Sequence, residues 1–96
     1  MLQELTIRAE SIDTLKPLLE VAIRNQLKSL QHGINRTKEE LAKFEARFGM
    51  TSDELERRLK SGELKETMDT IDWWMEITAL RLLEGQHKSL SEASLD

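Results

Sequence analysis

The sequence predicts an all-α protein in which two shorter helices fold back on one long amphipathic helix, within a coiled-coil-like dimer. Apolar residues recur at steps of three and four over residues 23–48, the pattern of a helix that packs one narrow stripe against another. Two further helix starts follow, at Thr51 and near Thr67. A hydrophobic content of 39% with 33% charged residues suits helices that each have one apolar face.

The long helix is expected over residues 14–48. Asp13 and Thr14 are candidate N-caps, and Pro17 is tolerated within the first turn. At 1.5 Å per residue the helix is about 50 Å long, which exceeds the diameter of a compact domain of this size. Its length therefore favours a helix shared by two chains. The stripe, with Thr37 as its polar member, consists of Ile23, Leu27, Leu30, Ile34, Leu41, Phe44 and Phe48.

Gly33 decides whether this helix is continuous. Glycine inside a helix costs about 1 kcal/mol relative to alanine, and glycine also serves at helix C-termini. Thr37 and Glu40 have the spacing of a capping box that would start a new helix. The rhythm of three and four nevertheless runs from Leu30 to Leu41 without a change of phase, so a continuous helix is favoured over a break.

A second helix is expected over residues 52–60, with Gly62 as its C′ residue. Thr51 and Glu54 occupy the N-cap and N3 positions of a capping box. The same helix start also has the two positions of a hydrophobic staple, Met50 and Leu55.

A third helix is expected from Thr67 or Asp69 to Glu84, ending before Gly85. This helix is apolar around much of its circumference, so it should be sandwiched between other elements. Its apolar positions form two stripes: Ile71, Trp74, Met75, Thr78 and Leu82 in one, and Trp73, Ile77, Leu80 and Leu83 in the other.

The chain is expected to form a single helical domain over residues 14–85. Residues 1–13 are expected to form an N-terminal arm or a short strand, which would need a partner strand for stability. Residues 86–96 are polar and small, and they are expected to be a disordered tail.

Composition argues against several classes of function. A formal net charge of −4 disfavours nucleic-acid binding, which needs clustered Lys and Arg. The absence of Cys excludes disulfides and zinc–thiolate sites, and it fits a cytoplasmic protein. No apolar run is long enough to span a membrane, and residues 1–10 do not resemble a signal peptide. No catalytic constellation stands out, and no cofactor is expected.

One alternative is a metal-dependent hydrolase. Asp69, Asp72 and Glu76 would share one helical face, and carboxylates are the ligands that Mg²⁺ prefers. These residues are weak candidates, because acids at a helix start also stabilise the helix macrodipole.

A second alternative depends on a helix break at Gly33. The N-terminal half would then run strand, helix, turn and helix, in the order of a ribbon-helix-helix DNA-binding regulator. In that arrangement Thr6 and Arg8 would face the major groove.

A pattern of helix-start and turn residues extends over residues 44–84. It resembles the shared core of a family of small archaeal and bacterial helical proteins that are often associated with toxin–antitoxin loci. The resemblance implies an antitoxin-like component that binds a toxin protein. The positions that carry it are Phe44, Glu45, Phe48, Gly49, Met50, Thr51, Glu54, Leu55, Gly62, Glu63, Leu64, Asp69, Asp72 and Trp73.

The sequence therefore favours a non-enzymatic protein–protein interaction module that forms a homodimer through its long helix. The C-terminal helices can cover residues 41–48, but nothing similar is expected to cover residues 23–34 within the same chain. Trp is enriched at the centres of interfaces. The predicted binding residues are Ile23, Leu27, Leu30 and Ile34 for a second copy, and Trp73, Trp74 and Met75 for a protein partner.

Overall fold

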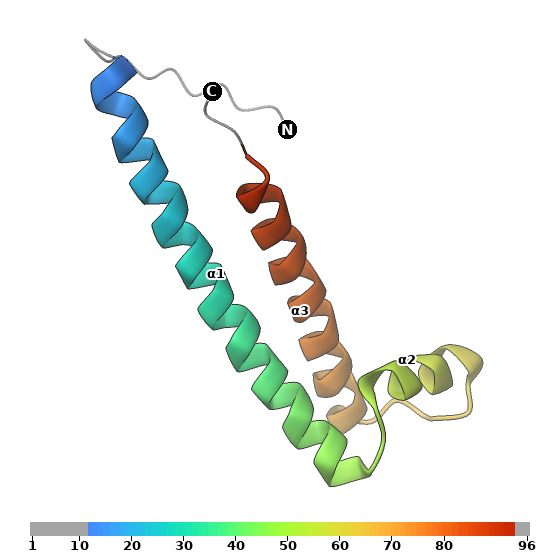
Figure 1. Ribbon diagram of the computed structural model, residues 1–96. Helices are drawn as coiled ribbons and strands as arrows, with labels where there is room; N and C mark the ends of the chain where they lie inside the picture. Colours follow the sequence, from blue (N-terminus) through green and yellow to red (C-terminus); the bar gives the residue numbers. More distant parts are fainter. Residues whose placement is uncertain (1–11, 94–96) are drawn as a thin grey trace.

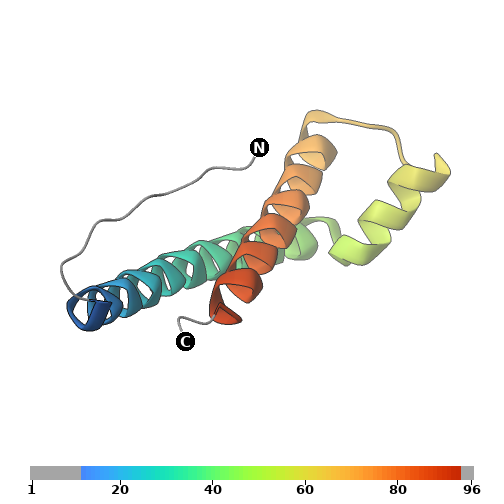
Figure 2. The same ribbon diagram turned by 90° about the horizontal axis from the view of Figure 1, so that it is seen from above.

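The computed structural model describes residues 12–93, and the regular elements within that range are three helices. They are α1 (Ile12–Phe48), α2 (Ser52–Ser61) and α3 (Met68–Ser91). α1 and α3 form an antiparallel hairpin, and α2 projects sideways from its closed end (Figure 1). Seen from above, α3 crosses α1 obliquely (Figure 2). The all-α fold with one long helix is confirmed, whereas the possible strand near the N-terminus lies outside the described residues.

α1 is a single helix that passes through Gly33 without a break. A Cβ atom at Gly33 would lie 3.3 Å from Cδ1 of Leu83, so glycine lets α3 approach α1 closely here. The predicted continuity is confirmed, and the turn that a ribbon-helix-helix arrangement requires at this position is not formed. The helix ends at Phe48, where Gly49 adopts a φ of 61° that favours glycine.

α2 has its predicted N-cap and its predicted C-terminal glycine, but the predicted capping box is only half formed. The backbone N–H of Glu54 donates to Oγ1 of Thr51 over 3.1 Å, so Thr51 is the N-cap. The carboxylate of Glu54 binds Arg57 and Arg58 instead of completing the capping box. Gly62 ends the helix in the left-handed conformation, with a φ of 80°.

α3 begins at a complete capping box and is longer than predicted. The N–H of Thr70 donates to Oγ1 of Thr67, and the N–H of Thr67 donates to Oγ1 of Thr70. The helix continues to Ser91, so the predicted end at Glu84 is wrong, and residues 86–91 are helical rather than a disordered tail. Packing along α1 can offset the cost of about 1 kcal/mol for one internal glycine, Gly85.

The core lies where the three helices meet. Its buried members come from every helix: Leu41 from α1, Leu55 from α2, and Trp73 and Ile77 from α3. Both residues of the predicted staple are in this cluster, with Met50 packed against the buried set. The partly buried apolar residues around it are Phe44, Met50, Leu59 and Leu80.

α3 covers part of the α1 stripe that the sequence pattern leaves uncovered. Leu30 and Ile34 are buried within the single chain, so the prediction that nothing in the same chain covers them is wrong. Ile23 and Leu27 are half-buried. α1 has 37 residues and α3 has 24, or about 55 Å and 36 Å, so the start of α1 extends past the end of α3 (Figure 1).

No helix within residues 12–93 is both long and apolar enough to cross a membrane.

Candidate protein-binding surface

The adjacent tryptophans of α3 have different environments. Trp73 is fully buried, and its ring stacks on Phe44 and on Phe48 with centroid distances of 5.6 Å in both cases. Trp74 is 44% exposed. Trp73 is therefore a core residue with no surface accessible to a partner. The prediction that it binds a protein partner is wrong. Trp74 and Met75 remain accessible.

A polar corner fixes the geometry around Trp73. Its Nε1–H donates to Oγ of Ser52 over 2.9 Å, and the backbone N–H of Ser52 donates to Oε2 of Glu45 over 2.7 Å. Arg47 forms an ion pair with Asp69 at 3.2 Å. These contacts tie the end of α1 to the starts of α2 and α3. No local pattern in the sequence predicts these contacts, because the residues that form them lie 7, 21 and 22 positions apart.

The two apolar stripes predicted on α3 face in different directions. Trp73 and Ile77 are buried, and Leu80 and Leu83 are half-buried. The other stripe is exposed, and Met68 at the start of α3 extends it. Without Trp74, which lies to one side, its spacing alternates between three and four residues, as in a helix that pairs with another helix. We call it the outer stripe, and it consists of Met68, Ile71, Met75, Thr78 and Leu82.

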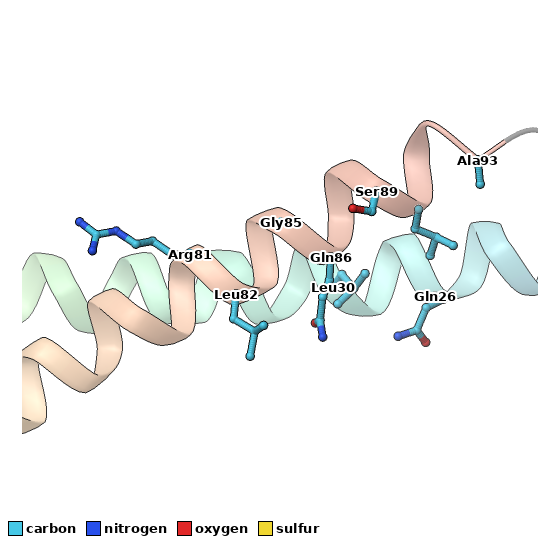
Figure 3. A pocket seen from close by; sticks show the side chains of 9 residues that line it. Gln26, Leu30, Arg81, Leu82, Gly85, Gln86, Ser89 and Ala93 are labelled. Carbon is cyan, nitrogen blue, oxygen red and sulfur yellow. The ribbon is translucent and has the colours of Figure 1, made fainter. Parts of the chain in front are cut away.

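The outer stripe ends in two surface hollows. The first has a volume of about 700 Å³ and includes Leu82, Gly85 and Ser89 of α3 with Leu30 of α1 (Figure 3). The second has a volume of about 440 Å³. Its lining comes from α2, the connector and α3, namely Glu56, Leu59, Lys60, Glu66, Ile71 and Trp74. The apolar surface of α3 is thus extended at each end by neighbouring elements.

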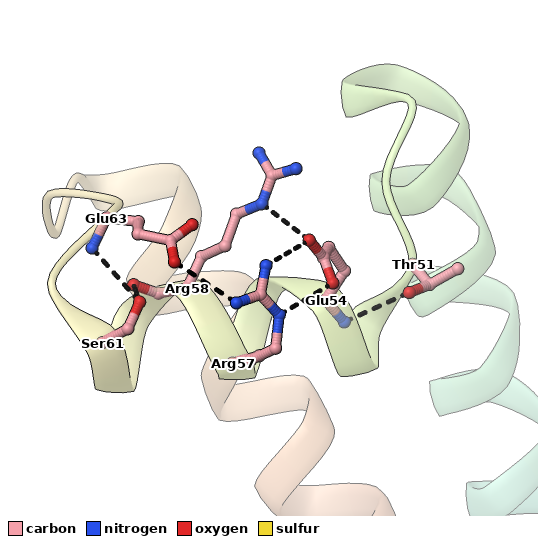
Figure 4. A network of polar contacts seen from close by, with 6 residues as sticks. All are labelled: Thr51, Glu54, Arg57, Arg58, Ser61 and Glu63. Carbon is pink, nitrogen blue, oxygen red and sulfur yellow. Dashed lines mark hydrogen bonds and ion pairs between the residues drawn. The ribbon is translucent and has the colours of Figure 1, made fainter.

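Ion pairs stabilise α2 and attach it to α3. Glu54 binds Nη2 of Arg57 at 2.7 Å and Nε of Arg58 at 2.9 Å (Figure 4). Hydrogen bonds from Arg57 and then Arg58 lower the pKa of Glu54 to about 2. Oε2 of Glu56 lies 2.7 Å from Nη2 of Arg81, which together with Lys60 lowers the pKa of Glu56.

The acidic residues considered as metal ligands do not form a site. Among residues 12–93, no group of three His, Cys, Asp or Glu side chains is placed to hold a metal ion. Asp69 pairs with Arg47, and Asp72 is exposed. The described residues therefore give the hydrolase alternative no ligand set.

No family model, curated protein or solved structure matches the chain.

Proposed function

We propose that this chain is a non-enzymatic protein-binding module that associates with another polypeptide through the outer stripe of α3. The observation that carries the proposal is the exposure of Met68, Met75 and Leu82, which are 75%, 59% and 62% exposed on a helix whose opposite face is buried. Contiguous apolar surface of this kind marks interaction sites.

The chemistry of the stripe supports a helical partner. Methionine side chains adapt to irregular apolar surfaces, and the spacing of three and four residues matches a helix-in-groove or helix-pair contact. A second copy and a toxin-like protein are both occupants that the proposal allows. The toxin-like partner follows from the resemblance of residues 44–84, and the second copy follows from the helical pattern.

A matched pair of substitutions tests the proposal. Met75 lies on the outer stripe and is 59% exposed, whereas Leu18 lies on α1 and is 64% exposed. An affinity-tagged chain would be produced in the cells from which the sequence comes, and the polypeptides it retains would be identified by mass spectrometry. Wild type and Leu18→Glu should retain the same polypeptide, and Met75→Glu should lose it. Circular dichroism would show that both variants remain folded.

Two results would contradict the proposal. One is that the wild-type chain retains neither an untagged copy of itself nor any other polypeptide. The other is that Met75→Glu retains as much as Leu18→Glu does.

A further inference from the structure

We infer that the outer stripe of α3 pairs antiparallel with the same stripe of a second copy of the chain. This inference rests on the proposed function and names its partner. It places the dimer contact on α3, whereas the sequence pattern had placed it on the N-terminal half of α1. Two residues of the interface predicted on α1, Leu30 and Ile34, are buried within their own chain.

Steric complementarity supports the second copy as the occupant. Antiparallel pairing about a two-fold axis near the middle of the stripe places Met68 opposite Gly85, Ile71 opposite Leu82, and Met75 opposite Thr78. Each methionine then faces a smaller residue, either Gly85 or Thr78. The two branched side chains, Ile71 and Leu82, face each other. A two-fold axis repeats every contact, as an isologous interface requires. A parallel pairing in register would instead place Met68 against Met68 and Gly85 against Gly85.

Charge distribution along α3 favours the same orientation. The segment from Met68 to Leu80 carries three carboxylates and no Lys or Arg, whereas the segment from Arg81 to Ser91 carries two basic residues and one acidic residue. Within the chain Asp69 already pairs with Arg47, and Arg81 pairs with Glu56. The remaining charges are two carboxylates in the first segment, and one lysine with one carboxylate in the second. Antiparallel pairing therefore places the acidic segment of one helix beside the balanced segment of the other. Parallel pairing would place the two acidic halves together, which is unfavourable.

The two surface hollows enlarge the predicted dimer interface beyond the outer stripe. The larger hollow, beside Gly85, and the smaller one, beside Ile71, lie toward opposite ends of the stripe. An antiparallel second copy brings the larger hollow of each chain next to the α2 side of the other. Residues of α1, α2 and the connector then join α3 in the contact. The two hollows and the outer stripe together comprise 18 residues of each copy, close to the roughly 20 that a standard interface takes from each partner.

Self-association of the purified chain is the first test, and Leu18 offers a closely matched control for Leu82. Leu82 and Leu18 are the same residue type and are 62% and 64% exposed. Size-exclusion chromatography with light scattering, at chain concentrations up to about 100 µM, should give the mass of two chains for wild type and Leu18→Glu. Leu82→Glu should weaken association at least tenfold, because a carboxylate would be buried opposite Ile71.

Disulfide cross-linking tests the orientation, and the absence of native Cys makes it unambiguous. The antiparallel register predicts that a mixture of Ile71→Cys and Leu82→Cys chains forms a disulfide-linked heterodimer on mild oxidation. Neither variant alone should cross-link, because its two thiols would be about 16 Å apart along the helices, from 11 residues at 1.5 Å, too far for a disulfide. A parallel pairing predicts that each variant cross-links alone.

The outcomes separate this inference from the proposed function. A monomer at every concentration, equal weakening by Leu18→Glu and Leu82→Glu, or cross-linking of either variant alone overturns the antiparallel α3 dimer. Such a result leaves the proposed function standing if the tagged chain still retains a different polypeptide that Met75→Glu loses. If the chain neither self-associates nor retains a different polypeptide, both the inference and the proposed function are overturned.

Discussion

Trp73 donates a hydrogen bond from Nε1 to Oγ of Ser52 over 2.9 Å, and this bond joins the closed end of the hairpin to the first residue of α2. The indole is fully buried, so Ser52 satisfies a donor that would otherwise have no access to water. The backbone N–H of Ser52 is in turn held by Glu45 of α1. One small polar residue therefore connects all three helices beside the core.

Replacing the two tryptophans should have very different effects on stability. Trp73→Ala removes a buried ring stacked on Phe44 and Phe48, and it should lower the free energy of unfolding by about 3–5 kcal/mol. Trp74→Ala removes a partly exposed ring and should cost about 1 kcal/mol or less. Urea unfolding followed by far-ultraviolet circular dichroism at one chain concentration measures both. Equal losses would contradict the assignment of Trp73 to the core.

Removing the Ser52 hydroxyl should cost more than its size suggests. Ser52→Ala leaves the buried Trp73 N–H without its acceptor, so the free energy of unfolding should fall by about 1–3 kcal/mol. Ser29→Ala is the control, because Ser29 is an exposed serine on α1, and it should change stability by about 0.5 kcal/mol or less. A loss for Ser52→Ala no larger than that of the control would show that the corner adds nothing to stability.

Local patterns in the sequence predicted much of this architecture. Thr51 caps α2 and Gly62 ends it, because each role depends on residues within a few positions. The continuity of α1 through Gly33 was likewise visible in the apolar rhythm on either side of it.

Features that depend on contacts between distant residues were not predictable in this way. The composition after Gly85 favours a helix end, but α3 continues to Ser91 along α1. Leu30 lies beside Gln86 and Leu90 of that extension, whereas Gly33, next to Ile34, lies against Leu83 in the predicted part of α3. The contacts of Arg47 with Asp69, and of Ser52 with Glu45 and Trp73, join residues whose proximity only the tertiary fold creates.

The two internal helical glycines should respond differently to alanine. At Gly85 an added Cβ meets nothing within 4 Å, so Gly85→Ala should raise the free energy of unfolding by about 1 kcal/mol through helix propensity. At Gly33 the Cβ would lie 3.3 Å from Cδ1 of Leu83, so repacking should cancel part of the same gain. Thermal unfolding in a Leu82→Glu background, where self-association is expected to be weak, compares the two. A larger gain at Gly33 would contradict the close approach of α3 to α1.

The ion pairs of Glu54 should make stability depend on acid pH. Arg57 and Arg58 lower the pKa of Glu54 to about 2 from an ordinary value of 4.5. A carboxyl whose pKa is lower in the folded chain stabilises the fold above its unfolded pKa, and this contribution is lost as pH falls through the folded pKa. The difference in stability between wild type and Glu54→Gln should therefore be largest above pH 4.5 and should shrink toward pH 2. Urea unfolding across this range measures it.

Glu39→Gln provides the reference for that titration, because Glu39 is exposed on α1, away from α2. Added salt should reduce the Glu54 effect, since both arginines that bind it are partly exposed and their interaction is screened. If Glu54→Gln and Glu39→Gln show the same dependence on pH, the pairing of Glu54 with Arg57 and Arg58 does not contribute to the stability of the chain in solution.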